Sequence, residues 1–497
     1  MIAGHSRIIV FVLLFISYSL VQARIRHIGA GHPWTSPSSI QNNVVAGDTV
    51  IIHAGSYAGA FFISNLAGTP TNPIIIEGAS GENVVFSGGS ESFHFSDISY
   101  VSIQNLIFQN QTGNGMNIDD AGTFNSPSHH IVIRNCTFRN ISASGNNDLL
   151  KLSGVDDFEV SDCTFLNGAS GGSGIDMVGC HRGLFQRLRF EQLGSNSIQI
   201  KGGSKDITIR RNYFLNGGAR AINIGGSTDL EFFRPQNASY EASTIEVYSN
   251  VIEGSEASFA FVGAVDCKVY NNTLLRPGKW AMRILQETVD ASRFEACGRN
   301  SVQNNIFILT TAVSTEVNIG PDTAPSTFIY SNNLWYKQGQ ANWQGPMLPV
   351  SDPSQVLGDP TVNNTTYMIS STSPAYQKGK STNPVVVDYY GKNFRTPPSI
   401  GAVEFEGSLA ISPQSESGKE DVGFKLKLYP NPAIEVIHLV TAESGTYQTV
   451  DGTGRVISRG NLESGINTIP VGQMNSGVYY LIVQFKYHSK NLKWIKL

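Results

Sequence analysis

The sequence has few charged residues and almost no net charge. Asp, Glu, Lys and Arg make up 15% of its 497 residues, and 35 basic residues against 39 acidic ones give a formal net charge of −4. This balance excludes a basic nucleic-acid-binding protein by bulk electrostatics. Glycine, by contrast, occurs 50 times. A glycine-rich composition with little charge favours extended β structure over a set of ordinary α/β domains.

Cysteine and long apolar runs are also scarce. No C-x-x-C or H-E-x-x-H pattern is present, so the sequence indicates neither a cysteine-rich metal site nor a zincin. The one long apolar run extends from Ile8 to Leu20, after Arg7 and before the small residues of Val21-Gln22-Ala23. We predict that residues 1–23 are a signal peptide. The alternative is a membrane anchor, but the run is shorter than the roughly 20 residues that a span needs.

A short phrase recurs nine times between residues 101 and 335. The copies are VSIQNLIF, IVIRNCTF, FEVSDCTF, GLFQRLRF, ITIRRNYF, IEVYSNVI, CKVYNNTL, SVQNNIF and FIYSNNLW. Their last residues are 22 to 38 positions apart, which is enough for three short strands with turns and is the period of a β-helix coil. We therefore predict an all-β chain whose residues 24–406 form a right-handed parallel β-helix.

Two positions before the end of the phrase, most copies have asparagine or cysteine. These residues are Asn212, Asn250, Asn272, Asn305, Asn333, Cys136 and Cys163. Equivalent positions in successive coils stack about 4.8 Å apart, so we predict an asparagine ladder whose amides satisfy the backbone of the turns. Cys136 and Cys163 are expected to be stacked thiols. Cys267 and Cys297 lie in neighbouring coils and are the better candidates for a disulfide.

Residues 24 to about 405 resemble the pectate-lyase-like β-helix superfamily. The opening VVAGDTVIIHAGSYAGAF (44–61) and the closing DYYGKNFRTPPSIGAVEFE (388–406) carry the resemblance at the two ends. From Lys425 onward, YPNP, DGTGR and SGVYYLIV follow in order and resemble the C-terminal sorting domain read by the type IX secretion system. This resemblance implies that residues 425–497 form a small β-sandwich, that the secretion machinery is a partner, and that the protein is secreted or attached to the cell surface. Residues 407–424 are small and polar and are expected to be a linker.

In each coil a short strand precedes the repeated phrase and should expose every second side chain. The first outward column is Asn117, Lys151, Asp176, Gln199, Asn223, Ala260 and Arg283, and the second is Asp119, Ser153, Lys201 and Gly225. Two insertions, residues 225–243 and 286–300, leave the helix just after this strand. Being two coils apart, they are expected to rise about 10 Å from each other as one wall of a groove. Ala260 is expected to leave room there for a sugar ring.

The segment SIQIKGGSKDITIRRNYFLNGGARAINIGG resembles a segment of chondroitinase B and related alginate lyases, in which a lysine ends one strand and an arginine belongs to the next coil. The resemblance implies a lyase that cleaves an acidic, uronate-containing polysaccharide, with Lys201 as the base. We expect Arg220 and Arg283 to neutralise or bind carboxylates. Lys201 and Arg283 are three coils apart, about 14 Å, so they would serve different subsites. The expected substrate-binding residues are Lys151, Asp176, Gln199, Asn223, Arg234, Glu241 and Glu287.

Two other functions fit the same sequence. A glycoside hydrolase needs two facing carboxylates, for which the candidates are Asp119, Asp176, Glu241 and Glu287. A non-catalytic carbohydrate-binding protein would use exposed aromatic rings, here Phe232, Phe233, Tyr240 and Trp280. No cofactor is required by the sequence, although a calcium ion could bridge Asp119 or Asp176 to a uronate. We expect a monomeric mature chain that has no membrane span and binds no nucleic acid.

Overall fold

The computed structural model describes residues 23–142, 147–381 and 387–405, and 427–429, 435–441, 444–451, 455–463, 465–475, 477–484 and 489–496 near the C-terminus. Two compact units are distinguished, residues 1–407 and residues 408–497. The predicted signal peptide, apart from Ala23, and the predicted linker at 407–424 lie outside the described residues.

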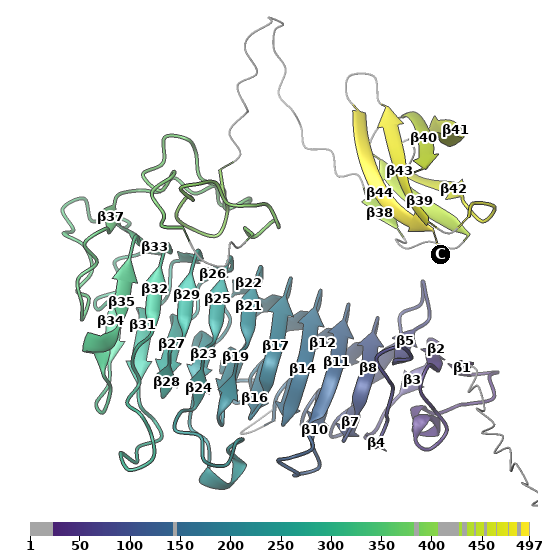
Figure 1. The fold of residues 1–497 in the computed structure, drawn as a ribbon, viewed down its shortest axis with the longest axis horizontal. Helices are drawn as coiled ribbons and strands as arrows, with labels where there is room; N and C mark the ends of the chain where they lie inside the picture. The colour runs from purple at the N-terminus through teal and green to yellow at the C-terminus, as the bar shows by residue number, and fades with distance from the viewer. Residues whose placement is uncertain are drawn as a thin grey trace, which may run out of the picture. The chain divides into compact units, whose positions relative to one another are not determined.

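The first unit consists of three long parallel sheets whose strands alternate along the chain (Figure 1). The first sheet contains β1 (Ile25–Ile28), β2 (Thr49–Ile52), β5 (Ile74–Gly78), β8 (Ser99–Gln104), β11 (Ser128–Arg134), β14 (Val155–Ser161), β17 (His181–Gln186), β21 (Thr208–Arg210), β25 (Glu246–Tyr248), β29 (Lys268–Tyr270), β32 (Ser301–Gln303) and β35 (Ile329–Ser331), with β20 (Ser204–Lys205), β24 (Ala242–Ser243) and β28 (Ala264–Val265) beside them. The second contains β3 (Ser56–Tyr57), β6 (Val85–Ser87), β9 (Ile107–Gln109), β12 (Thr137–Arg139), β15 (Thr164–Leu166), β18 (Arg189–Glu191), β22 (Tyr213–Leu215), β26 (Val251–Glu253), β30 (Thr273–Leu275), β33 (Ile306–Leu309), β36 (Leu334–Lys337) and β37 (Val356–Leu357).

The third sheet carries the outward columns. Its strands are β4 (Phe61–Ser64), β7 (Phe93–Ser96), β10 (Met116–Asp119), β13 (Leu150–Ser153), β16 (Ile175–Val178), β19 (Asn196–Lys201), β23 (Arg220–Gly225), β27 (Ala257–Val262), β31 (Trp280–Leu285) and β34 (Val317–Ile319). The described helices are short 3-10 turns, η1 (Pro37–Ile40), η2 (Leu230–Phe232) and η3 (Pro325–Thr327). The predicted parallel β-helix is confirmed.

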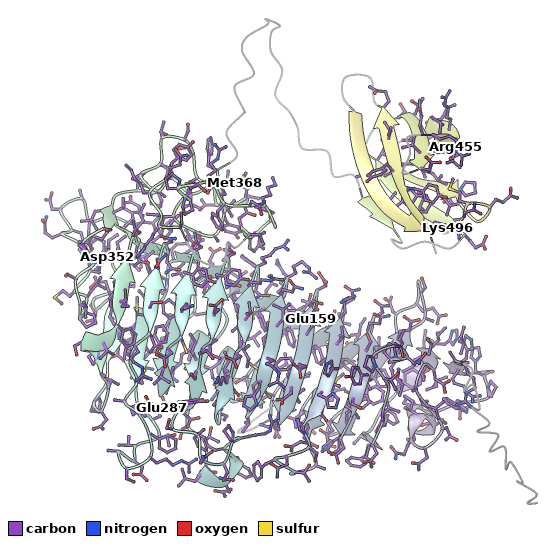
Figure 2. The ribbon with its side chains drawn as sticks, in the orientation of Figure 1. Glu159, Glu287, Asp352, Met368, Arg455 and Lys496 are labelled. Atoms are coloured by element: carbon purple, nitrogen blue, oxygen red, sulfur yellow. The ribbon has the colours of Figure 1, made fainter. Side chains whose placement is uncertain are left out.

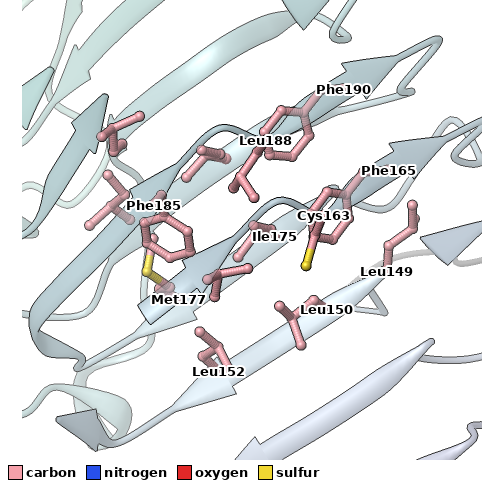
Figure 3. Close-up of a cluster of buried hydrophobic side chains, with 14 of the residues drawn as sticks. Leu149, Leu150, Leu152, Cys163, Phe165, Ile175, Met177, Phe185, Leu188 and Phe190 are labelled. Carbon is pink, nitrogen blue, oxygen red and sulfur yellow. The ribbon is translucent and has the colours of Figure 1, made fainter. Parts of the chain in front are cut away.

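The coils are held in register by the apolar column that ends the repeated phrase. Phe108, Phe138, Phe165, Phe190, Phe214, Ile252, Leu274, Phe307 and Trp335 pair in this order across the second sheet. Successive phenylalanine rings stack with centroids 4.8 to 5.0 Å apart. Figure 3 shows Leu150, Leu152, Ile175 and Met177 of the third sheet pointing into the same core. Burying this continuous apolar column stabilises the coils against sliding past one another.

In the corner between the first and second sheets, each coil has one left-handed residue followed by a buried one. The buried residue is leucine or cysteine in the earlier coils (Leu106, Cys136, Cys163 and Leu188) and asparagine from Asn212 to Asn333. Left-handed φ angles of 50° to 60° recur at Asn105, Asn135, Asp162, Arg187, Arg211, Ser249, Asn271, Asn304 and Asn332. Directly after them, the side-chain amide of each ladder asparagine donates to the next, as Asn250 does to Asn272 at 3.0 Å. The same amide donates to the carbonyls of Ile209 and Tyr248. The asparagine ladder is therefore confirmed, and it ends at Asp352, which is labelled in Figure 2.

The cysteines follow the prediction in part. Cys136 and Cys163 are stacked thiols, with the Cys136 backbone N–H 3.4 Å from the Cys163 sulfur. All five cysteines are buried and free, so the disulfide predicted between Cys267 and Cys297 is wrong. The reason is the register: the side chain of Asn300, at 2.8 Å, caps the Cys267 backbone N–H, so Asn300 occupies the equivalent position in the next coil. Cys297 instead belongs to the 286–300 insertion.

The C-terminal unit is antiparallel. One sheet has the order β38 (Lys427–Tyr429), β39 (Val436–Thr441) and β42 (Gly465–Pro470). The other has the order β41 (Val456–Leu462), β40 (Gly445–Asp451), β43 (Gly477–Gln484) and β44 (Ser489–Lys496). A separate apolar core that includes Leu439, Leu481 and Trp494 fills this unit. This is the small β-sandwich that the sequence predicted.

Candidate active site

The first outward column of the third sheet has the register that the sequence predicted. Asn117, Lys151, Asp176, Gln199, Asn223, Ala260 and Arg283 pair in that order, one per coil. The column continues past both ends, to His94 and Phe62 on one side and Asn318 on the other. Parallel pairing keeps the spacing near 4.8 Å, so these side chains form a row along the helix axis. In the second column the register shifts after Gln199, so Gly225 pairs with Ile200 and not with Lys201 as predicted.

A pocket of about 450 Å³ lies over β10 to β19, where the strands of the third sheet end. We call it the lysine pocket. Its lining residues are Asn117, Asp119, Asp120, Gly122, Phe124, Lys151, Ser153, Gly154, Val178, Lys201, Ser227, Thr228, Asp229, Phe232 and Arg234. The sheet supplies the floor, and residues 120–124 and 227–234 supply the walls. Lys151 and Lys201, both predicted site residues, therefore face one cavity.

The two lysines share one carboxylate. Lys151 Nζ lies 3.1 Å from Asp176 Oδ2 and 3.3 Å from Asp148 Oδ2. Lys201 Nζ lies 3.7 Å from the other oxygen of Asp176, beyond hydrogen-bond distance. Burial lowers the pKa of Lys151, but the charges of Asp176 and Asp148 outweigh it and leave that pKa raised. Burial and the charge of Asp176 raise the pKa of Asp148 to about 7. Lys151 is therefore a fixed cation, while Lys201 is less tightly paired.

A histidine and an aspartate form a charged pair at one end of the pocket. His94 Nε2 lies 2.6 Å from Asp119 Oδ2, and Ser96 Oγ donates to Asp119 Oδ1 at 2.6 Å. The hydrogen bond with Asp119, followed by that with Glu91, raises the pKa of His94 to about 9. Burial raises the pKa of Asp119, but the hydrogen bonds from His94 and Ser96 outweigh it and the pKa is lowered. Neither His94 nor Asp148 was among the sequence candidates.

Arg220 and Arg283 lie outside the lysine pocket. Arg220 donates to Asn223 Oδ1 at 3.1 Å and to Glu287 Oε1 at 2.9 Å, so its side chain bridges two coils. Glu287 is labelled in Figure 2 at the edge where the loops leave the helix. Arg283 lies over the Trp280 ring at 4.4 Å. Ala260, in the coil between, is completely buried. The room expected above Ala260 is therefore absent, because the Arg220 side chain crosses that coil.

The two insertions contact each other, whereas the sequence predicted that they rise about 10 Å apart. The rings of Phe233 and Phe294 lie tilted to each other with centroids 5.2 Å apart, and Arg293 lies over both rings. Together the insertions line a second cavity of about 730 Å³. Its charged lining residues are acidic: Asp229, Glu231, Glu287 and Asp290. The larger cavity therefore has no lysine or arginine among its lining residues and is less suited to an anionic sugar than the lysine pocket.

Two predicted substrate-binding residues hold the loops instead. Glu241 is completely buried. Its carboxylate accepts hydrogen bonds from the backbone N–H of Gly202 and Thr228 and from the hydroxyls of Thr228 and Thr288. The prediction that Glu241 contacts substrate is wrong, because no part of it is accessible. The carboxylate satisfies the buried backbone where the two insertions meet.

Arg234 holds the first insertion to the helix. Its guanidinium pairs with both oxygens of Asp156 at 2.7 and 2.8 Å and donates to the carbonyls of Gly179 and Phe124. The side chain is 10% exposed. Arg234 lines the lysine pocket, but every nitrogen of its guanidinium has a partner. It therefore positions the walls, and its contact with substrate stays a prediction.

The remaining polar residues lie between the lysine pocket and Arg220. Gln199 Oε1 accepts from Asn196 at 2.9 Å. Asn223 is 1% exposed and donates to the Gly225 carbonyl. Asp176 is 2% exposed, because the lysines cover it. These residues form hydrogen bonds and ion pairs within the third sheet and support the side chains that face solvent.

Exposed aromatic rings stand at the mouth of the lysine pocket. Phe232 is 56% exposed and Phe124 is 41% exposed. Of the other rings proposed from the sequence, Phe233 is completely buried, so its predicted exposure is wrong. Trp280 lies between Lys279 and Arg283, at 4.2 and 4.4 Å. Phe124 was missed because it lies in a loop without periodicity.

The pocket carboxylates are poorly suited to calcium. Both oxygens of Asp119 accept hydrogen bonds. Oδ1 accepts from Ser96 and Ala121, and Oδ2 accepts from His94 and Asn117. The oxygens of Asp176 face the two lysines. Calcium prefers six to eight oxygen ligands, and these carboxylates already face cations and hydrogen-bond donors. We therefore derive no step through calcium.

Sequence comparisons agree with this architecture. Residues 91–274 match the family model of the right handed beta helix region, and residues 427–496 match that of the secretion system C-terminal sorting domain. The chain therefore contains a right-handed β-helix region and a C-terminal sorting domain of the type IX secretion system. The β-helix protein is therefore exported, either secreted or attached to the cell surface. Among the described residues, none forms a helix long and apolar enough to cross a membrane.

Solved structures share the fold of the β-helix protein at low identity. Pectate lyase Pel9A is 14% identical, with a TM-score of 0.51, over 78% of this chain and 98% of that chain. An alginate lyase from Paenibacillus sp. str. FPU-7 is 14% identical, with a TM-score of 0.40, over 62% of this chain and 97% of that chain. A complex of XylC with xylose is 9% identical, with a TM-score of 0.45, over 90% of this chain and 100% of that chain. No curated protein sequence matches the chain. Of these three, Pel9A is the one with a TM-score above 0.5, and its likeness shows the fold alone.

Proposed function

We propose that the β-helix protein cleaves an acidic, uronate-containing polysaccharide by β-elimination in the lysine pocket. The observation that carries this proposal is the pair of lysines on the pocket floor, of which Lys151 is held between two carboxylates and Lys201 is 3.7 Å from one. Elimination needs a base beside a cation that holds the substrate carboxylate. A fold shared with a pectate lyase supports the same reaction class.

In this reaction the side-chain nitrogen of Lys201 takes the proton from carbon 5 of the uronate. The electrons of the broken C–H bond form the double bond between carbons 4 and 5, and the bond from carbon 4 to the glycosidic oxygen breaks. The leaving oxygen takes a proton from water, and Lys201 returns its proton to solvent. Lys151 is the cation assigned to the carboxylate, because the raised pKa keeps its ammonium charged. The developing negative charge is stabilised where the carboxylate binds.

The rest of the cleft supplies subsites in this proposal. Phe124 and Phe232 present exposed ring faces at the mouth, where a sugar ring can stack. Arg283 lies further along the same row, and Arg220 lies in β23, two coils before Arg283. Both are assigned to the carboxylate of a more distant sugar residue. Since Arg283 is three coils from Lys201, the two cannot act on one ring.

One observation favours glycoside hydrolysis as a second candidate. Asp119 and Asp120 both line the lysine pocket, and their pKa values move in opposite directions. The pKa of Asp119 is lowered, while burial raises that of Asp120. Carboxyl groups whose pKa values are driven apart are the pattern of an acid and its partner base or nucleophile. In this alternative the lysines only bind substrate.

The test uses residues 24–497 with pectate, alginate, chondroitin, heparin and ulvan as substrates. Absorbance of unsaturated products and the appearance of reducing ends are followed together. Elimination raises both signals, and Lys201→Ala is expected to abolish both. The matched control is Lys205→Ala, an exposed lysine four residues on that does not line the pocket. Reducing ends without unsaturation, lost in Asp119→Asn or Asp120→Asn, would establish hydrolysis instead. Silence on every polymer would contradict both enzymatic proposals and favour the binding protein.

A further inference from the structure

Three histidines meet at the N-terminal end of the helix, where β1 pairs with β2, and none of them lines the lysine pocket. His27 lies in β1, His32 in the loop that follows, and His53 directly after β2. One ring nitrogen from each lies within 4.8 Å of the others. His27 Nδ1 is 2.9 Å from His53 Nε2, and the rings of His32 and His53 stack at 4.2 Å. All three are partly exposed, so an ion could reach them from solvent.

A carboxylate orients the central histidine. Glu82 Oε1 lies 2.9 Å from His53 Nδ1, and Glu82 Oε2 accepts the backbone N–H of Ala54 at 2.7 Å. A charged carboxylate at Nδ1 places the proton on that nitrogen and leaves the lone pair on Nε2, which faces His27. Carboxylate–histidine pairs of this kind orient metal-binding imidazoles.

The backbone is shaped to bring the rings together. Gly29 follows β1 with a φ of +151°, and a side chain there would place its Cβ 2.9 Å from the Cβ of His53 and 3.6 Å from Cδ2 of His32. The hydroxyl of Tyr57 donates to the carbonyl of His53 at 2.7 Å. Both features fix the segments that carry the histidines, and only a residue without a side chain fits at position 29.

We propose that His27, His32 and His53 form a zinc-binding site, with Glu82 supporting His53 and the fourth position open to water. Three imidazoles with an open position are a recurrent zinc set, and neutral imidazole suits zinc better than the hard cations calcium and magnesium. The ion would join β1, the following loop and the end of β2. Because β1 pairs only with β2 among the described strands, such a link would fasten the outermost strand of the first sheet.

The experiment is calorimetric titration of zinc chloride into untagged residues 24–497 that have been treated with a chelator. One zinc per chain is expected, with a melting temperature that rises as free zinc increases. Magnesium chloride is expected to give neither effect. His27→Ala and His32→Ala are expected to abolish saturable binding, and Glu82→Gln to weaken it by about 10- to 100-fold.

The matched control is His129→Ala, which alters a histidine pair in another coil whose Nδ1 atoms are 2.8 Å apart. This variant is expected to bind zinc like the wild type. Saturable binding that persists in the His27→Ala, His32→Ala double variant would overturn the proposal. Should these variants fail to fold, the zinc absorption-edge spectrum of the wild type decides. Three nitrogen ligands support the site, while sulfur ligands or oxygen ligands alone refute it. None of these outcomes depends on polysaccharide cleavage.

Discussion

The ion pair between Arg234 and Asp156 offers the sharpest test of how the pocket walls are held. The side chains are 10% and 7% exposed, so solvent screens their interaction little. Removing one partner of a buried, hydrogen-bonded pair typically costs 3–5 kcal/mol. Asp156 keeps a contact with Arg182 at 2.9 Å. We therefore expect Arg234→Met to lower the free energy of unfolding by about 3 kcal/mol at pH 7, the low end of that range.

A double-mutant cycle with Asp156→Asn separates this pair from its surroundings. The variants are compared by urea unfolding of the β-helix unit, followed by circular dichroism. The double variant is expected to lose less stability than the two single variants combined, with a coupling of about 1.5–3 kcal/mol. Arg182→Met is the matched control: this arginine also contacts Asp156 but is 51% exposed, so we expect a loss under about 1 kcal/mol.

The pH dependence of the free energy of unfolding tests the same ion pair in a second way. Burial raises the pKa of Asp156, but hydrogen bonds from Arg234 and His181 outweigh it, and the pKa is lowered strongly. A carboxyl group with a depressed pKa stabilises the fold above its unfolded pKa, near 4, and this stability is lost as the pH falls further. The difference in the free energy of unfolding between the wild type and Arg234→Met should therefore become smaller below about pH 4. Additive effects, or a difference that does not change with pH, would refute the reasoning.

Four further predictions follow from contacts described above. His94→Gln should lower the free energy of unfolding by about 2–3 kcal/mol near pH 6. This loss should disappear as the pH rises through 9, because a histidine with a raised pKa stabilises the fold only while its ring is protonated. Equal urea midpoints for the variant and the wild type at pH 6 would contradict this. Asn250→Leu removes the acceptor of Asn212 N–H and the donor to two buried carbonyls, so it should cost at least about 3 kcal/mol in thermal or urea unfolding. Since all five cysteines are buried thiols, dithiothreitol should leave the melting temperature unchanged, and a thiol reagent should react fully only after unfolding. If the proposed function holds, Phe232→Ala should raise KM about 2- to 10-fold with little change in kcat, because a stacked ring contributes about 0.5–1.5 kcal/mol.

The sequence predicted whatever repeats from coil to coil. The phenylalanine column, the asparagine ladder and the outward row could all be aligned because parallel pairing maps equal positions onto each other. His94 could have been found in the same way, since it pairs with Asn117 in the strand before. That strand, FHFS, has the same alternation as its successors.

The loops could not be predicted to this depth. Phe124, Asp148, Arg234 and Glu241 lie in segments without periodicity, and their burial depends on how insertions from different coils fold over one another. A charged residue in such a loop can face substrate or hold a wall, and only the contacts distinguish these roles. The 2% exposure of Asp176 has a similar origin, because long side chains from neighbouring coils cover it.

The asparagine ladder has a direction. From Asn212 to Asn333, each side-chain amide donates one hydrogen bond to the side-chain carbonyl of the next asparagine toward the C-terminus, so the side-chain carbonyls all accept from the coil before. The aligned amide dipoles therefore add along the axis, as peptide dipoles do in an α-helix, and each bond polarises the next. The positive end of this row meets the carboxylate of Asp352. In an α-helix the positive end of the dipole is the N-terminus, where a carboxylate is favourable. Asp352 has the corresponding position at the positive end of the asparagine ladder, so the last coils have an electrostatic cap made entirely of side chains.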